Sequence, residues 1–126
     1  MTRPFRLVVL LALAICPVLL AAEGDSASRT GWFSDEWCAP SKVKSDKVGP
    51  NNRDCVQKCL KKGAKMVFID EKSKVLYAVE NPEAASGQES HYVQVAGTLD
   101  GQGKTLHVSS VKVLETYKAS CSVPKK

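Results

Sequence analysis

The strongest structural constraint in this chain is an alternating segment near its C-terminal end. The odd-numbered residues from Val93 to Leu99 are apolar or glycine, the turn-forming run Asp100 to Gly103 follows, and apolar residues resume at Leu106. A period of two puts one set of side chains on a single sheet face. The sequence therefore predicts a β-hairpin, which needs further strands to bury that face.

The second strand of this hairpin contains a change of phase. Its apolar positions are first Leu106 and Val108 and then Val111 and Val113, with two serines at the join. An extra residue in one strand, a β-bulge, would return both pairs to one buried face. We therefore predict a bulge at Ser109 and Ser110.

Three more short strands precede the hairpin. Residues 30–34 contain an aromatic run, residues 66–69 are continuously apolar, and residues 75–79 are rich in β-branched and aromatic side chains. The last two are separated by a polar turn and indicate a second hairpin. Residues 83–89 have a weak tendency to form one helical turn.

One helix is predicted between the first and second strands. Asn51 or Asn52 is a suitable N-cap, Asp54 lies in the first turn, and Gly63 follows two lysines at the end. Within it, Cys55, Val56, Cys59 and Leu60 share one face. Both cysteines are therefore predicted to face or border the core.

These elements predict a mostly β fold with one α-helix. Five short strands avoid exposed edges best by closing on themselves. A helical link between the third and fourth strands favours a small five-stranded OB-like barrel, in which the longer helix is an insertion between strands 1 and 2.

The N-terminus has the pattern of a secretory signal peptide. Arg3 and Arg6 precede an apolar run from Leu7 to Leu20, which is shorter than the roughly 20 residues of a membrane span. We predict a signal peptide at residues 1–22, with cleavage after Ala22 or Gly24, a flexible leader at 23–29 and a single domain at 30–126. The protein is then secreted or periplasmic, without a transmembrane anchor.

Charge and motifs narrow the function. The chain has 18 basic and 13 acidic residues, and removal of residues 1–22 takes two basic residues with it, so the charge falls from +5 to +3. This modest charge and the exported compartment disfavour nucleic-acid binding. The sequence contains no Gly-x-Ser-x-Gly, His-Glu-x-x-His or Walker-type motif. We expect neither an enzyme nor a cofactor.

Four cysteines remain after processing, at positions 38, 55, 59 and 121. An even number in an exported chain favours disulfides. Because a bridge within one helix is strained, we predict that either Cys55 or Cys59 pairs with Cys38 and that the other pairs with Cys121. The alternative is that Cys38, Cys55 and Cys59 bind a soft metal or carry thiol redox chemistry.

Two features suggest binding surfaces. Trp32, Trp37 and Tyr92 are candidates for a ligand surface, since OB barrels bind ligands through exposed aromatic residues, although core packing would also explain them. Lysines between positions 42 and 65 make the loop and helix basic. A cell-envelope protein or a polyanion is therefore a candidate partner.

The sequence also resembles a known family. The segment Gly31-Trp32-x-Ser34-Asp35-x-x-Cys38, the Cys55-x3-Cys59 pair and the run from Val93 to Leu99 resemble small secreted bacterial proteins of unknown function with an OB-like barrel. The resemblance covers about residues 30–113 and implies export, an OB-like fold and a cysteine cluster, but no activity. Cys121 lies beyond it.

The function that this pattern favours is a non-enzymatic binding or interaction module of the cell envelope. The alternative is a metal-binding or thiol redox protein that uses Cys38, Cys55 and Cys59.

Overall fold

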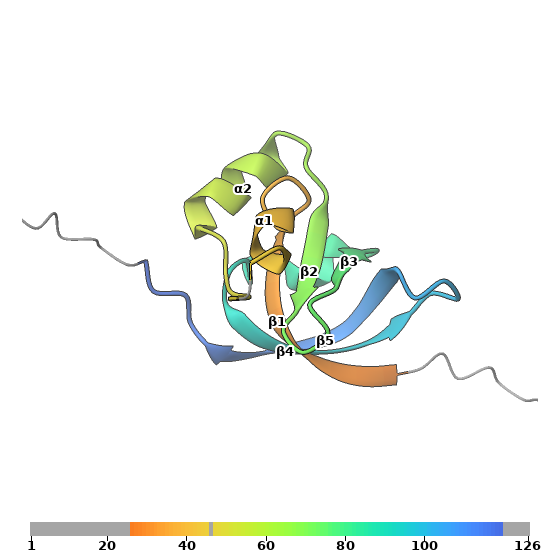
Figure 1. Cartoon of the computed structure of the whole chain (residues 1–126). Coiled ribbons are helices and arrows are strands. Elements are labelled where there is room, and N and C mark those ends of the chain that lie inside the picture. Colours follow the sequence, from red (N-terminus) through yellow and green to blue (C-terminus); the bar gives the residue numbers. More distant parts are fainter. Residues whose placement is uncertain (1–25, 46, 120–126) are drawn as a thin grey trace, which may run out of the picture.

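The computed structural model describes residues 26–45 and 47–119 of the 126-residue chain. The expected signal peptide at 1–22 and Cys121 lie outside these residues. In chain order the elements are β1 (Ser26–Asp35), α1 (Pro40–Val43), α2 (Arg53–Lys61), β2 (Met66–Asp70), β3 (Leu76–Val79), the 3-10 turn η1 (Pro82–Ala85), β4 (Tyr92–Leu99) and β5 (Thr105–Glu115). The predicted mostly β fold is confirmed, but two α-helices rather than one lie between β1 and β2, because Pro40–Val43 forms a short helix where a loop was expected (Figure 1).

The five strands form one closed barrel in the order β1-β2-β3-β5-β4. All neighbouring strands are antiparallel except β3 and β5, which are parallel. The long strand β1 closes the barrel because it pairs with β4 through residues 26–32 and with β2 through residues 31–35. Figure 1 shows both helices together at one end of the barrel.

Glycine is required where β1 passes from one partner strand to the other. Gly31 pairs with Val93 on one side and Asp70 on the other. A Cβ atom at Gly31 would collide with the backbone carbonyl of Ile69. The absence of a side chain therefore allows the close approach of β1 and β2 that closes the barrel.

The start of β1 corrects the expected leader. Residues 26–29 pair with residues 95–98 of β4, so β1 begins at Ser26 rather than at Thr30. The interpretation of residues 26–29 as part of a flexible leader is wrong. Their small and polar side chains gave no hydrophobic signal, and only the partner strand reveals that they belong to the sheet.

The bulge predicted in the last strand is confirmed. Ala96 pairs with Ser110 whereas Gly97 pairs with Val108, which leaves Ser109 as the extra residue. Val111 then packs against the core, but Val113 is 38% exposed. The buried face of β5 therefore ends after Val111, earlier than we expected.

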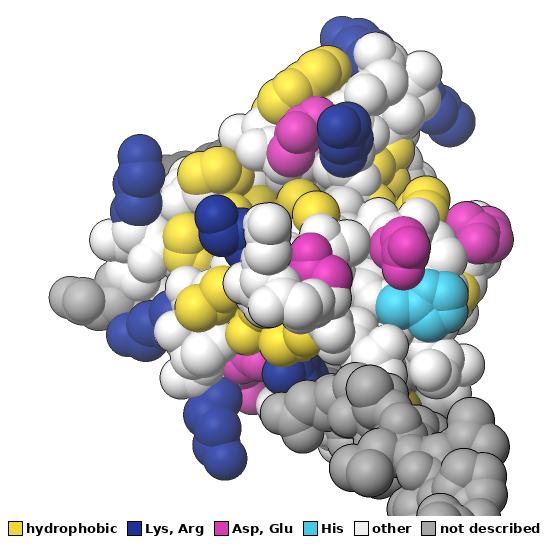
Figure 2. Space-filling view, turned by 90° about the vertical axis from the view of Figure 1, so that its right-hand side faces the viewer, with side chains coloured by type: hydrophobic (Ala, Val, Ile, Leu, Met, Phe, Trp, Pro, Cys, Tyr) yellow, Lys and Arg dark blue, Asp and Glu magenta, His cyan; other side chains and the backbone are white. Residues whose placement is uncertain are grey.

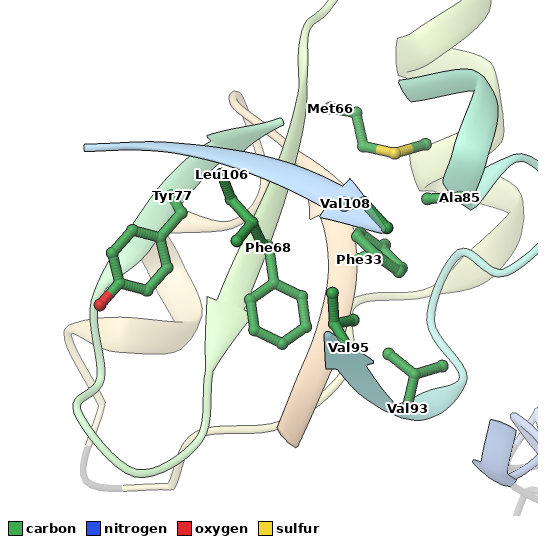
Figure 3. Packing of buried hydrophobic residues seen from close by; sticks show 9 residues of the cluster. All are labelled: Phe33, Met66, Phe68, Tyr77, Ala85, Val93, Val95, Leu106 and Val108. Carbon is green, nitrogen blue, oxygen red and sulfur yellow. The ribbon is translucent and has the colours of Figure 1, made fainter. Parts of the chain in front are cut away.

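The barrel interior holds the main core, in which Phe33, Phe68 and Val95 lie close together in Figure 3. Phe33 and Phe68 are fully buried and their ring centroids are 5.3 Å apart. A second cluster forms on the other side of β2, where Val67 and Ile69 pack against Ala39. Because β2 is buried on both faces, its residues 66–69 are continuously apolar rather than alternating.

The helix α2 begins and ends as predicted. The Asn52 side chain accepts a hydrogen bond from the Cys55 backbone N–H at 3.1 Å, and Gly63 has a φ of +100° directly after the last turn. Such a positive φ favours glycine. Of the four residues predicted to share the inner face, Val56 is buried but Cys55 is exposed, so that part of the prediction is wrong.

We expect Gly31→Ala to lower the free energy of unfolding by roughly 1 to 3 kcal/mol, the usual cost of forcing atoms into a packed region. Gly101→Ala is the matched control, because a Cβ there meets nothing within 4 Å. It should change stability by less than about 0.5 kcal/mol. Urea unfolding of the two variants tests this, and equal effects would contradict the role assigned to Gly31.

Candidate functional site

A groove of about 650 Å³ crosses one side of the barrel, and we call it the aromatic groove. Its volume lies within the range of small-molecule sites. β1, the segment between β1 and β2, the β2–β3 turn, β4 and the chain around the end of β5 all contribute to it. It is lined by Trp32, Lys42, Pro50, Asn52, Glu71, Ser90, Tyr92, Glu115, Thr116, Tyr117 and Lys118.

Two of the three predicted ligand-surface residues meet in this groove. Trp32 and Tyr92 are directly opposite each other in the β1–β4 ladder, and their ring centroids are 5.3 Å apart at an interplanar angle of 40°. Both residues are only partly buried. Trp32 also packs against the second hydrophobic cluster, which holds the pair in place.

Glu71 binds the hydroxyl group of Tyr92. Its Oε2 accepts hydrogen bonds from the Tyr92 hydroxyl at 2.6 Å and from the Thr30 hydroxyl at 3.3 Å. The hydrogen bond to Glu71 is the main cause that raises the pKa of Tyr92 above its ordinary value. Tyr92 therefore remains a neutral phenol. Its ring is positioned by the contact with the Trp32 ring and by the hydrogen bond from its hydroxyl to Glu71.

His91 positions the chain that follows β5. The Tyr117 backbone N–H donates a hydrogen bond to His91 Nδ1 at 2.7 Å. Burial, followed by the charge of Arg53, lowers the pKa of His91. The resulting neutral imidazole keeps Nδ1 free to accept, so the segment carrying Tyr117 is held as a wall of the groove.

Ser90 brings an unsatisfied polar group to the same region. It is 1% exposed, has a φ of +63°, and its hydroxyl has no hydrogen-bond partner among the described residues. Buried hydroxyls normally have partners. Ser90 therefore places a buried hydroxyl without a protein partner beside the groove that it lines.

The third aromatic candidate lies elsewhere. Trp37 is 56% exposed and does not line the aromatic groove.

A second groove of about 660 Å³ runs between α2 and η1 and has mainly apolar walls, among them Leu60, Met66 and Val79. Neither tryptophan belongs to it.

The cysteines separate into a cluster and an outlier. Cys38 and Cys59 approach each other and Asp35, with one ligand atom of each residue within 4.8 Å of the other two. Cys55 is exposed on the outside of α2. The alternative metal set of Cys38, Cys55 and Cys59 is therefore not brought together, and Asp35 is the third potential ligand instead of Cys55. The structure also has no bridge from Cys38 to Cys55 or Cys59, and Cys121 lies outside the described residues.

The environment of Cys38 disfavours a reactive thiol. Burial raises the pKa of Cys38 to about 11, and the negative charge of Asp35 and the neighbouring Cys59 contribute in the same direction. Thiol redox chemistry needs a thiolate and hence a lowered pKa. The environment of Cys38 therefore gives no support to the redox form of the cysteine hypothesis.

Most of the lysines proposed for a polyanion surface are exposed, and the face shown in Figure 2 has no continuous basic patch. Basic side chains at its upper end and left edge are interspersed with acidic and apolar ones. Lysines 44, 47, 58, 61, 62 and 65 are exposed. Surface charges of mixed sign generally mark a solvated face.

Comparison of the chain with protein-family models, curated proteins and solved structures finds no match. Within residues 26–45 and 47–119, none of the helices has the length and hydrophobicity to cross a bilayer.

Sequence reasoning found Trp32 and Tyr92 but missed Glu71, Ser90 and Tyr117. These three lie in a turn, in a loop and beyond the last strand. They reach the groove only through the closure of the barrel. The positive φ of Ser90 has no sequence signal, because serine is common in every kind of loop.

We expect acid to destabilise the protein through His91. Because its pKa is lowered in the folded state, the unfolded chain binds more protons between the ordinary value of 6.5 and the lower folded value. Stability is therefore present above about pH 6.5 and declines as the pH falls through that window. The free energy of unfolding of His91→Gln, measured between pH 7.5 and 5, should fall less steeply than that of the wild type. Parallel curves would contradict this assignment.

Proposed function

We propose that this protein is an exported, non-enzymatic binding module on an OB-like barrel, and that the aromatic groove binds its ligand. The observation that carries the proposal is the Trp32–Tyr92 pair, which packs on one side against the protein and lies partly exposed in a groove on the other. Aromatic rings buried on one side and open on the other are typical of ligand surfaces.

The strand order supports the OB-like assignment. Five strands close in the order β1-β2-β3-β5-β4, and the helical turn η1 lies between β3 and β4. OB barrels use the loop between strands 1 and 2 in ligand binding. Here that connection contributes Lys42, Pro50 and Asn52 to the groove.

The chemistry of the walls favours a neutral oligosaccharide. Two basic residues, Lys42 and Lys118, are balanced by two acidic ones, Glu71 and Glu115, so the groove carries no net charge to attract a polyanion. Flat aromatic faces suit the apolar faces of sugar rings, and carboxylate and hydroxyl groups suit sugar hydroxyls. OB barrels bind oligosaccharides as well as oligonucleotides.

The hydrogen bonds that Glu71 accepts also agree with a binding role. Its Oε2 already accepts hydrogen bonds from Tyr92 and Thr30. A carboxylate held in this way is suited to orient a ligand hydroxyl. We therefore assign Glu71 to ligand positioning.

The two tryptophans make the proposal directly testable, because they are the only ones in the chain. In a Trp37→Phe variant, Trp32 is the sole tryptophan. Titration with neutral chito- and cello-oligosaccharides should produce a saturable change in its fluorescence. Adding Tyr117→Ala should weaken binding by about threefold to tenfold, the worth of one aromatic contact.

The Trp32→Phe variant, in which only Trp37 reports, is the matched control and should give no saturable signal. Identical responses from both single-tryptophan proteins would contradict the aromatic groove as the binding surface. A response to heparin without any to neutral sugars would replace the oligosaccharide by a polyanion.

A further inference from the structure

The end of β1 and the helix α2 bring three potential metal ligands together, away from the aromatic groove. Asp35 is the last residue of β1, Cys38 lies in the turn that follows, and Cys59 lies on α2. One oxygen or sulfur atom from each lies within 4.8 Å of the other two. None of the three lines the groove.

Asp35 has one oxygen engaged and one free. Its Oδ1 accepts hydrogen bonds from the backbone N–H groups of Trp37 and Cys38, both at 3.0 Å. Asp35 is fully buried, and its Oδ2 has no hydrogen-bond partner among the described residues. Burying an unpaired carboxylate oxygen is costly unless a cation compensates for it.

We propose that Asp35, Cys38 and Cys59 bind one soft divalent metal ion of the zinc type, with a fourth coordination position open to water or an added ligand. Two thiolates and one carboxylate are a donor set that Zn²⁺ accepts. Metal–sulfur bonds of about 2.3 Å in a tetrahedral site separate the two sulfurs by about 3.8 Å. Ligand atoms within 4.8 Å of one another therefore need to move by only about 1 Å.

Neighbouring hydrogen bonds fix the turn that carries Cys38, and the two cysteine side chains stay accessible to solvent. Asn51 donates a side-chain hydrogen bond to the Cys38 carbonyl at 3.2 Å and accepts one from the Ser34 hydroxyl at 2.7 Å. Cys38 and Cys59 are only partly buried, so an ion can enter from solvent. The turn is thus arranged by contacts that do not involve the metal.

The alternative to metal coordination is a disulfide bond between Cys38 and Cys59. Such a bridge is electrically neutral and would leave Asp35 Oδ2 buried without a countercharge. A divalent cation satisfies the carboxylate and both sulfurs at once. The orphaned oxygen is therefore the observation that favours the metal.

The ion would connect the helical insertion to the barrel. Cys59 belongs to α2, whereas Asp35 belongs to β1, so coordination crosses from one to the other. The same insertion supplies Lys42, Pro50 and Asn52 to the aromatic groove. The metal site goes beyond the proposed binding function and can exist whether or not the groove binds a sugar.

The test is Co²⁺ and Zn²⁺ binding by the full exported chain, purified without chelators or reductant, with Co²⁺ as the spectroscopic probe. One equivalent of Co²⁺ should bind and give a thiolate-to-cobalt charge-transfer band. Cys38→Ser, Cys59→Ser and Asp35→Asn should each lower the affinity by more than about tenfold, the smallest usual loss on removing even a residue that supports a ligand. Zn²⁺ should raise the melting temperature of the wild type but not of the cysteine variants.

Cys55→Ser is the matched control, because Cys55 lies on the same helix but is exposed and outside the cluster. It should retain wild-type affinity and spectrum. The proposal is overturned if the wild type binds no metal, if Cys55→Ser loses as much affinity as Cys59→Ser, or if peptide mapping of the isolated protein finds Cys38 joined to Cys59. Asp35→Asn keeps an oxygen at Oδ1 for the turn, so a folded Asp35→Asn protein with full metal affinity would also overturn it.

Discussion

The rest of the structure depends on the close approach of β1 and β2 at Gly31. At this position the pairing of β1 with β2 begins while its pairing with β4 ends one residue later, and the carbonyl of Ile69 occupies the space that a Cβ would need. Because β1 pairs with both β2 and β4, the sheet closes on itself and these strands expose no unpaired edge to each other. The missing side chain at Gly31 thus permits one of the close strand contacts in a closed barrel with a buried interior.

Both candidate sites follow from this closure. The residue after Gly31 is Trp32, which lies opposite Tyr92 because β1 and β4 are paired there. The last residue of β1 is Asp35, which is carried under α2 because β1 continues along β2. One strand therefore delivers an aromatic ring to one side of the barrel and a buried carboxylate to its helical end.

The two sites differ in what they need from their surroundings. The aromatic groove is assembled from polar contacts to Glu71 and His91 that fix ring and backbone orientation, and its charges balance. The cluster of Asp35, Cys38 and Cys59 carries an oxygen without a partner. The balanced charges of the groove underlie our proposal of a neutral ligand, and the unpaired Asp35 oxygen underlies our proposal of a cation.

Local patterns in the sequence determined the elements: the alternation from Val93 to Leu99, the bulge at Ser109, and the ends of α2 at Asn52 and Gly63. Each depends on neighbours within a few residues, so each can be read along the chain. Only the tertiary structure decided that residues 26–29 belong to β1, that Cys55 is exposed, and that Asp35 joins Cys38 and Cys59. Those outcomes depend on which strand or helix lies opposite, and small polar residues, helix faces and single carboxylates carry no local signal of a distant partner.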